Sequence, residues 1–175
     1  AYSLNDRVAA PWAAPAGKNR GVLSAVESTS VKLNKNNLDD LYDADINPIT
    51  SFPGTKNIVW GQKTLLSSES ALDRINVRRL LISVRRSVRI VANSLLFEPN
   101  RESTLSKFKS LVEPILQNVQ DRNGVSRYKV VIDSSTTTQA DIENNTIRGK
   151  IYLQPTRTVE FVALDFVVTN TGAEI

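Results

Sequence analysis

The hydrophobic and polar positions between residues 75 and 96 repeat with the period of an α-helix. Seven apolar residues recur every three or four positions on one face: Val77, Leu80, Leu81, Val84, Val88, Val91 and Leu95. At about 100° per residue, a set of arginines falls within roughly a 120° arc on the opposite side. We call this set the arginine face, and it comprises Arg78, Arg79, Arg85, Arg86 and Arg89, with Ile82 in the middle of its arc.

A second helical pattern runs from a cap near Asn100 to the Asn123-Gly124 pair, which is typical of a helix end. Pro114 is expected to kink this helix or to move its start later in the chain. A shorter helix is predicted in NLDDLYDADI, which begins at Asn37. The residues of the second helix that are expected to face inward are Leu105, Phe108, Val112, Ile115 and Val119.

Short β-type runs dominate the last third of the chain, and they predict an α+β fold with a small β-sheet and packed helices. The runs are SRYKVVID, RGKIYLQP and VEFVALDFVVT, with one helical turn expected in TTTQADIENN between the first two. The last run is apolar on both faces, because Phe161, Ala163 and Val167 alternate with Val162, Leu164, Phe166 and Val168. This pattern is typical of a strand inserted between other strands.

Residues 1–21 contain the prolines and small residues of PWAAPAGKNRG, and they predict an extended, irregular segment without helix that wraps over another surface. A further structured loop, with a short strand in KNIVW, is expected around Trp60. We therefore divide the chain into a linker or arm, residues 1–21, and a domain, residues 22–175. Within this domain, residues 158–175 are expected to form a terminal strand or arm.

The amino-acid composition limits the kinds of catalytic and metal-binding site that the chain can form. The 175 residues include neither cysteine nor histidine, which excludes thiolate nucleophiles and the commonest metal ligand and general base. With 22 basic and 18 acidic residues, the net charge of +4 is modest. No run has the length of a transmembrane helix, and the first residues do not resemble a signal peptide, so a soluble chain is expected. The absence of methionine suggests a fragment of a longer protein.

Three patterns that superficially suggest a catalytic or ligand site fail on spacing or context. Gly61, Lys63 and Thr64 lack the glycine spacing of a phosphate-binding loop. Asp141 and Glu143 are paired carboxylates without a pocket signal. An acidic cluster lacks EF-hand spacing and is better read as a solvated face, or as a partner for arginines of another subunit. Its members are Asp39, Asp40, Asp43 and Asp45. We therefore predict no catalytic residue, cofactor or metal.

The arginine face has three interpretations: a solvated surface, a nucleic-acid contact, or a contact with protein carboxylates. A solubility face usually mixes lysine with glutamate, whereas this one contains only arginine, which suits bidentate pairing. Ile82 indicates a partly covered surface. Single-strand nucleic-acid binders interleave aromatic residues, and none occurs here before Phe97. Protein carboxylates are favoured, with a basic nucleic-acid-binding module as the alternative.

Five stretches in order resemble the carboxy-terminal, tube-proximal region of contractile bacteriophage tail sheath proteins. They are WAAPAGKNRG, LYDADINPITSFPGTKNIVWGQKTL, INVRRLLISVRRSV, FEPN and GKIYLQPTRTVEFVALDFVVTNTGA. Sheaths of contractile bacteriocins and of type VI secretion are related alternatives.

The resemblance implies a structural subunit of the virion, not an enzyme, that is assembled in the host cytoplasm. Its longer parent would carry outward-facing domains and would form stacked hexameric rings around the tail tube. Extended arms would add strands to neighbouring subunits, and contraction would drive the tube through the host envelope. The implied partners are other sheath subunits, the tail tube protein, the baseplate and the tail terminator, without direct nucleic-acid contact or membrane insertion.

The resemblance also suggests roles for individual residues. The arginine face would contact neighbouring subunits or the tube. The strand-adding side chains would be Phe161, Val162, Leu164, Phe166 and Val168. A candidate tube contact covers the segment from Gln139 to Asn145, with Asp141 and Glu143, followed by Arg148 and Lys150.

Overall fold

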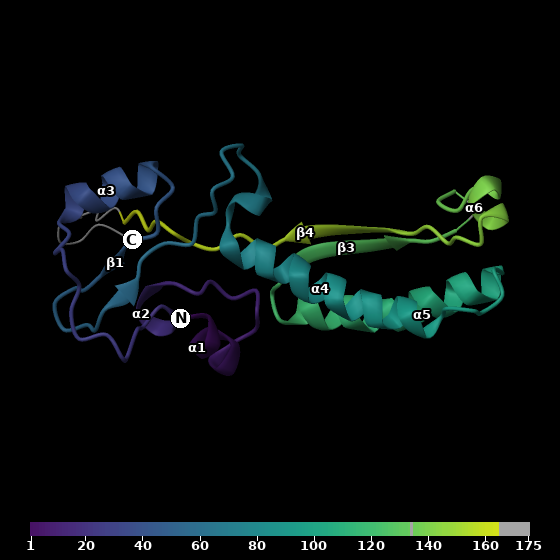
Figure 1. The fold of residues 1–175 in the computed structure, drawn as a ribbon, viewed down its shortest axis with the longest axis horizontal. Helices are drawn as coiled ribbons and strands as arrows, with labels where there is room; N and C mark the ends of the chain where they lie inside the picture. Colours follow the sequence, from purple (N-terminus) through teal and green to yellow (C-terminus); the bar gives the residue numbers. More distant parts are fainter. Residues whose placement is uncertain (134, 165–175) are drawn as a thin grey trace, which may run out of the picture.

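The computed structural model describes residues 1–133 and 135–164, which form an elongated molecule (Figure 1). One end contains the amino-terminal elements: α1 (Tyr2–Val8), α2 (Gly17–Arg20), α3 (Lys35–Asp43), β1 (Ile49–Thr50) and β2 (Ile58–Val59). After the 3-10 helix η1 (Ala71–Asp73), the chain continues into the other end. The elements there are α4 (Ile75–Ser94), α5 (Glu102–Asp121), β3 (Val125–Val131), α6 (Gln139–Glu143) and β4 (Lys150–Pro155).

Helix α4 confirms the first predicted helix. Its apolar face packs against α5, where Leu80 and Val84 are buried in the core, and Val77 of the same face is buried as well. The residues of the opposite face are largely exposed to solvent, as the amphipathic pattern predicts. Burial of a leucine or valine side chain stabilises the folded state by about 1.5–3 kcal/mol. The apolar face therefore determines which side of α4 faces outward.

Helix α5 begins at Glu102 and continues through Pro114, so the proline does not move the start of the helix. Leu116 is fully buried, whereas the predicted inward residue Ile115 is only half-buried. The helix ends as predicted: Asn123 has a left-handed φ of 57°, and the Gly124 amide donates to the Val119 carbonyl at 2.8 Å.

The amino-terminal segment is partly helical, and the prediction that residues 1–21 contain no helix is wrong for α1 and α2. Helices this short are marginal alone, so contacts with the rest of the chain must hold them. Trp12 is buried in the core, and its Nε1 donates to the Arg122 carbonyl at 3.0 Å. Ala10 and Trp12 belong to the same buried core as residues of α4 and α5.

Strands β3 and β4 form an antiparallel two-stranded sheet, with Lys129 opposite Tyr152 and Val130 opposite Ile151. One face packs on the helices, while Lys129 and Tyr152 are exposed on the other. The two predicted runs and the helical turn between them, α6, are therefore confirmed, as is the α+β class. Among the described residues, neither strand pairs along its outer edge.

The third predicted run has no strand partner in the part of it that the structure describes, residues 159–164. Its apolar side chains are exposed: Val159 by 82%, Phe161 by 74%, Val162 by 75% and Leu164 by 72%. Phe166 and Val168 lie outside the described residues. The segment runs back along the molecule toward α3 (Figure 1).

Candidate assembly surfaces

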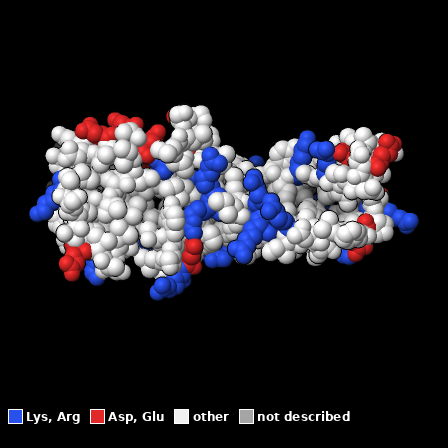
Figure 2. All heavy atoms as spheres, viewed as in Figure 1, with Lys and Arg blue, Asp and Glu red and all other residues white. Residues whose placement is uncertain are grey.

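Four members of the arginine face, Arg78, Arg85, Arg86 and Arg89, are exposed. Lysine and arginine side chains gather in a band across the middle of the molecule, where Figure 1 places α4 (Figure 2). Ile82 is 67% exposed among them, which adds an apolar group to a charged surface. Such a surface suits a partner that presents carboxylates around a small apolar patch.

The fifth member, Arg79, differs from the others because its side chain is only 16% exposed. Its Nη2 donates to both carboxylate oxygens of Asp6, and its guanidinium lies 4.8 Å from the centroid of the Tyr2 ring. Asp6 and Tyr2 belong to α1. Arg79 therefore anchors the amino-terminal helix to α4.

The terminal segment is attached to the domain at its root and exposed beyond it. Arg74, the N-cap residue of α4, pairs with Glu160, with 2.8 Å between Nε and Oε1. Burial alone would lower the pKa of Arg74, but its hydrogen bond and charge interaction with Glu160 raise the pKa. Past this point, Val162 and Leu164 project into solvent. Three of the five predicted strand-adding residues, Phe161, Val162 and Leu164, are therefore exposed.

The candidate tube contact contains charges that hold its own structure together and charges that are exposed. Asp141 and Thr138 form a capping box that starts α6. Arg148 Nε donates to Asp141 at 2.5 Å, and this bond, with those from Thr138, lowers the pKa of Asp141 to about 2. Glu143 and Lys150 are exposed. Asp141 is thus a structural residue, whereas Glu143 and Lys150 are available to a partner.

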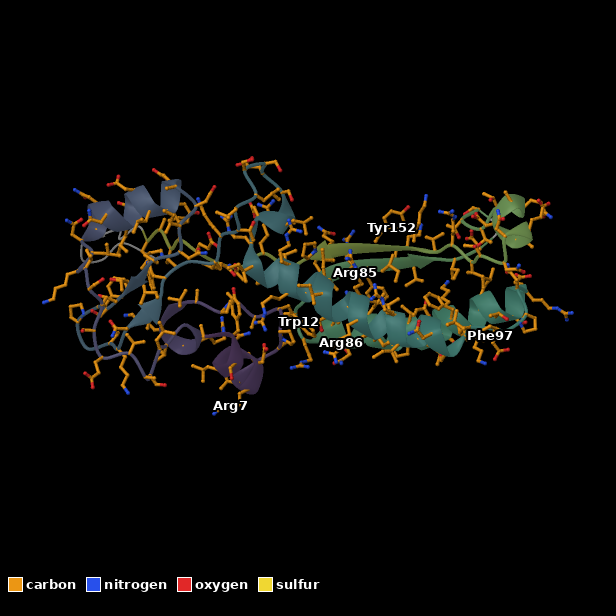
Figure 3. The ribbon with its side chains drawn as sticks, viewed as in Figure 1. Arg7, Trp12, Arg85, Arg86, Phe97 and Tyr152 are labelled. Atoms are coloured by element: carbon orange, nitrogen blue, oxygen red, sulfur yellow. The ribbon has the colours of Figure 1, made fainter. Side chains whose placement is uncertain are left out.

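An exposed apolar tip at the end of α4 was not predicted. Phe97 is fully exposed and has a left-handed φ of 70°, and Leu96 and Ile90 are more than 60% exposed. Figure 3 shows Phe97 near the end of the molecule where α4 meets α5. A groove of about 820 Å³ lies beside it. The sequence signal was the apolar run LLF directly before Glu98 and Pro99, after the helical period ends.

The patterns set aside in the sequence have structural roles. Lys63 Nζ pairs with Asp45 at 2.9 Å and lies 3.7 Å from the centroid of the Tyr42 ring. Trp60, 41% exposed, packs edge-on against Phe52. Within residues 1–133 and 135–164, no group of three or more acidic side chains is placed to hold a metal ion. No helix in that part of the chain is long and apolar enough to span a membrane.

The fold is shared with contractile injection systems. A chain of the PVC sheath complex of an extracellular contractile injection system, in the contracted state, matches with a TM-score of 0.86 and 26% identity. That match covers 95% of this chain and 48% of the other. A chain of the anti-feeding prophage baseplate gives a TM-score of 0.87 and 24% identity, over 96% and 48%. The molecule therefore has the α+β fold of chains in these assemblies.

The comparison of sequences assigns the chain to one family within this fold. The model of the phage tail sheath C-terminal domain matches residues 67–169, and the chain belongs to this family. Tail sheath proteins of Vibrio phage KVP40 and Enterobacteria phage T4 are 39% and 35% identical over 98% and 97% of the chain. That of Salmonella phage ViI is 29% identical over 99% of it. The chain spans about a quarter of the length of these relatives, 26–27%.

Proposed function

We propose that this chain is the carboxy-terminal domain of a contractile tail sheath subunit in a phage virion. The subunit polymerises in the host cytoplasm as stacked hexameric rings around the tail tube and contracts to drive the tube through the host envelope. The observation that carries the proposal is the family match over residues 67–169. The role is structural, with assembly supplying the energy of contraction, and we propose no catalytic step.

The terminal arm, residues 158–175, adds a strand to a neighbouring subunit. Two observations support this step: apolar side chains at 161, 162 and 164 are exposed, and within residues 1–133 and 135–164 the β3–β4 sheet has two strands. The outer edges of such a sheet leave main-chain groups unpaired, and main-chain hydrogen bonds from an added strand to a sheet edge supply affinity. The arm of one copy therefore docks on β3 or β4 of another.

The exposed part of the arginine face pairs with carboxylates between subunits. Helix α3 offers suitable groups, because Asp39, Asp40 and Asp43 are all exposed, and acidic side chains gather over α3 in Figure 2. Exposed ion pairs contribute only about 0–1 kcal/mol each, so a set of them can be exchanged between an extended and a contracted packing.

Attachment to the tail tube involves the segment around α6, through Glu143, Lys150 and the exposed side of Arg148. Helix α6 lies at the end of the molecule away from α3 (Figure 1). The baseplate and the tail terminator cap the sheath at its two ends. Neither nucleic acid nor a membrane is a direct partner of this domain.

The test is Leu164→Pro in the full-length gene product, because proline removes a ladder donor at the centre of the donated strand. The control is Leu65→Pro, since Leu65 is a 91% exposed loop residue. Electron microscopy and sedimentation should show loss of sheath polymers only for Leu164→Pro. Polymers of normal length from this variant would refute strand addition.

A DNA-binding assay separates the sheath proposal from a nucleic-acid-binding module. We expect negligible binding at physiological salt. Submicromolar binding there, with a log-log salt slope of about 0.9 per neutralised phosphate, would favour the nucleic-acid module instead.

A further inference from the structure

The root of the terminal arm, residues 158–161, is held by side chains from three distant places in the chain. Gln62 Nε2 donates to Thr158 Oγ1 and to Glu160 Oε1, the latter at 3.2 Å. Arg74 Nε donates to Glu160 Oε1 at 2.8 Å, and the Tyr42 hydroxyl donates to Glu160 Oε2 at 3.3 Å. One carboxylate thus accepts from a loop residue, the N-cap of α4 and a residue of α3.

The groups that hold Glu160 are themselves fixed. Arg74 Nη2 donates to the Tyr42 hydroxyl at 3.3 Å, and Lys63 Nζ donates to the Tyr42 carbonyl at 2.6 Å. Phe161 packs edge-on against the Tyr42 ring, with 5.6 Å between centroids. The root of the arm therefore joins a connected polar network, which we call the arm joint: Tyr42, Gln62, Arg74, Thr158 and Glu160.

Burial along this segment is the reverse of that in a core strand. The side chain of Glu160 is 22% exposed, although the residue as a whole is exposed. The residues Val159 and Val162 on either side are 82% and 75% exposed. A carboxylate turned inward between apolar residues turned outward indicates a segment fixed by its polar residue. Its apolar side chains are left for another surface.

The register of the donated strand needs such a fixed point. A strand normally finds its register because a slip of one residue moves its apolar side chains from the buried face to water. Here that signal rests on one residue, because residues 161–168 are apolar except for Asp165. A strand slipped by one residue would move Asp165 to the other face but would still bury apolar groups on each side. A fixed point outside the strand therefore adds to the register signal.

We propose that Glu160 is a positioning residue that sets the start, direction and register of the strand donated to a neighbouring subunit. This inference rests on the proposed strand addition. Arg74 holds Glu160 and is also the N-cap residue of α4, so the arm is attached directly at the start of the helix that carries the arginine face. The arm joint makes the distance from α4 to the first donated residue constant from subunit to subunit.

Glu160→Gln in the full-length gene product tests this inference, with the exposed Glu69→Gln as the matched control. In the unassembled subunit, trypsin should cleave after Arg157 about tenfold faster in the Glu160 variant, because the joint no longer holds the residues after the scissile bond. Tenfold corresponds to about 1.4 kcal/mol. Arg74→Gln should have the same effect, and the double variant should add little, because both remove one interaction.

Cryo-electron microscopy of assembled Glu160→Gln particles supplies the second readout. Arms in more than one register, or loss of regular polymers together with faster cleavage, would support the proposal. Unchanged cleavage, or a single wild-type register, would overturn it. Leu164→Pro distinguishes a failure of the proposed strand addition from a failure of the proposed role of Glu160. If the Leu164→Pro variant assembles normally, the proposal of strand addition is wrong. If the Leu164→Pro variant does not assemble, while Glu160→Gln keeps a single register, only the proposed role of Glu160 is wrong.

Discussion

Arg79 and Asp6 form an ion pair between α4 and α1, in which Nη2 of the arginine donates to the two carboxylate oxygens at 2.5 and 2.7 Å. Within the described residues, an acidic partner for the arginine face is found only at this position. The charges left for another subunit are therefore Arg78, Arg85, Arg86 and Arg89. One side of α4 thus holds the amino-terminal segment and also presents the charges that we propose contact a partner.

Asp6→Asn should loosen α1 without affecting α4. The Arg79 side chain is 16% exposed and would lose its carboxylate, but Asp6 is 47% exposed, so solvent screening limits the effect to about 1 kcal/mol. Hydrogen exchange of residues 1–12 in the full-length gene product should accelerate about fivefold. Asp39→Asn, on the exposed side of α3, is the control. Equal exchange in both variants would mean that the pair does not anchor the segment.

Replacing Arg85 and Arg86 by glutamate should leave the subunit folded and abolish assembly. The buried face centred on Val84 is untouched, and Figure 3 shows the two arginines on the middle of α4. Lysine at both positions should be intermediate, because charge survives without the bidentate fork. Sedimentation and circular dichroism measure assembly and folding.

The control for that variant is the same change at Lys107 and Lys109, which alters the net charge equally on exposed positions of α5. A solvated surface would tolerate both double variants within about 0.5 kcal/mol and would assemble normally. Unfolding of the Arg85 and Arg86 variant as a subunit would instead assign these arginines to the interior of the fold.

Much of this architecture follows from local pattern. Helices α4 and α5 and strands β3 and β4 have long or regular periodicities, and each was predicted within a few residues. Helix α1 was missed because its stability comes from contacts with residues far along the chain, through Asp6 and the neighbouring Trp12. Nor does sequence separate Arg79 from Arg78, since both lie on one arc and only the position of Asp6 distinguishes them.

Charge reversal at Glu143 should weaken attachment to the tail tube while sheath self-assembly continues. The residue is exposed at the end of α6, so the change leaves the helix intact. Co-sedimentation of tube and sheath measures attachment. Charge reversal at Glu102, also exposed but in the first turn of α5, is the control. Unchanged attachment would remove α6 from the tube contact.

The capping box of α6 should titrate at unusually low pH. Hydrogen bonds from Arg148 and Thr138 lower the pKa of Asp141 to about 2, below the usual value of about 4. The ionised carboxylate therefore stabilises the fold above about pH 4, and this contribution is lost as pH falls through 2. NMR of selectively labelled aspartate should give a midpoint near 2, which Arg148→Gln should raise. A midpoint near 4 in the unchanged protein would contradict the observed cap.

Phe97→Gly should stabilise the folded subunit and impair its contacts with other subunits. A left-handed φ of 70° is strained for a bulky residue, and the ring is fully exposed, so removing it sacrifices little burial. Thermal unfolding should show a gain of about 1 kcal/mol. Leu65→Gly, at an exposed loop position, is the comparison and should not stabilise. Normal assembly of the Phe97 variant would show that the apolar tip serves no contact.

Cryo-electron microscopy of the assembled particle, at a resolution that shows side chains, tests strand addition most directly. We predict that the segment after Phe161 is a strand hydrogen-bonded to the outer edge of β3 or β4 of a different copy, with Glu160 still bound to Arg74 of its own chain. An arm that pairs with its own subunit, or that remains without a strand partner in the assembled sheath, would contradict this prediction.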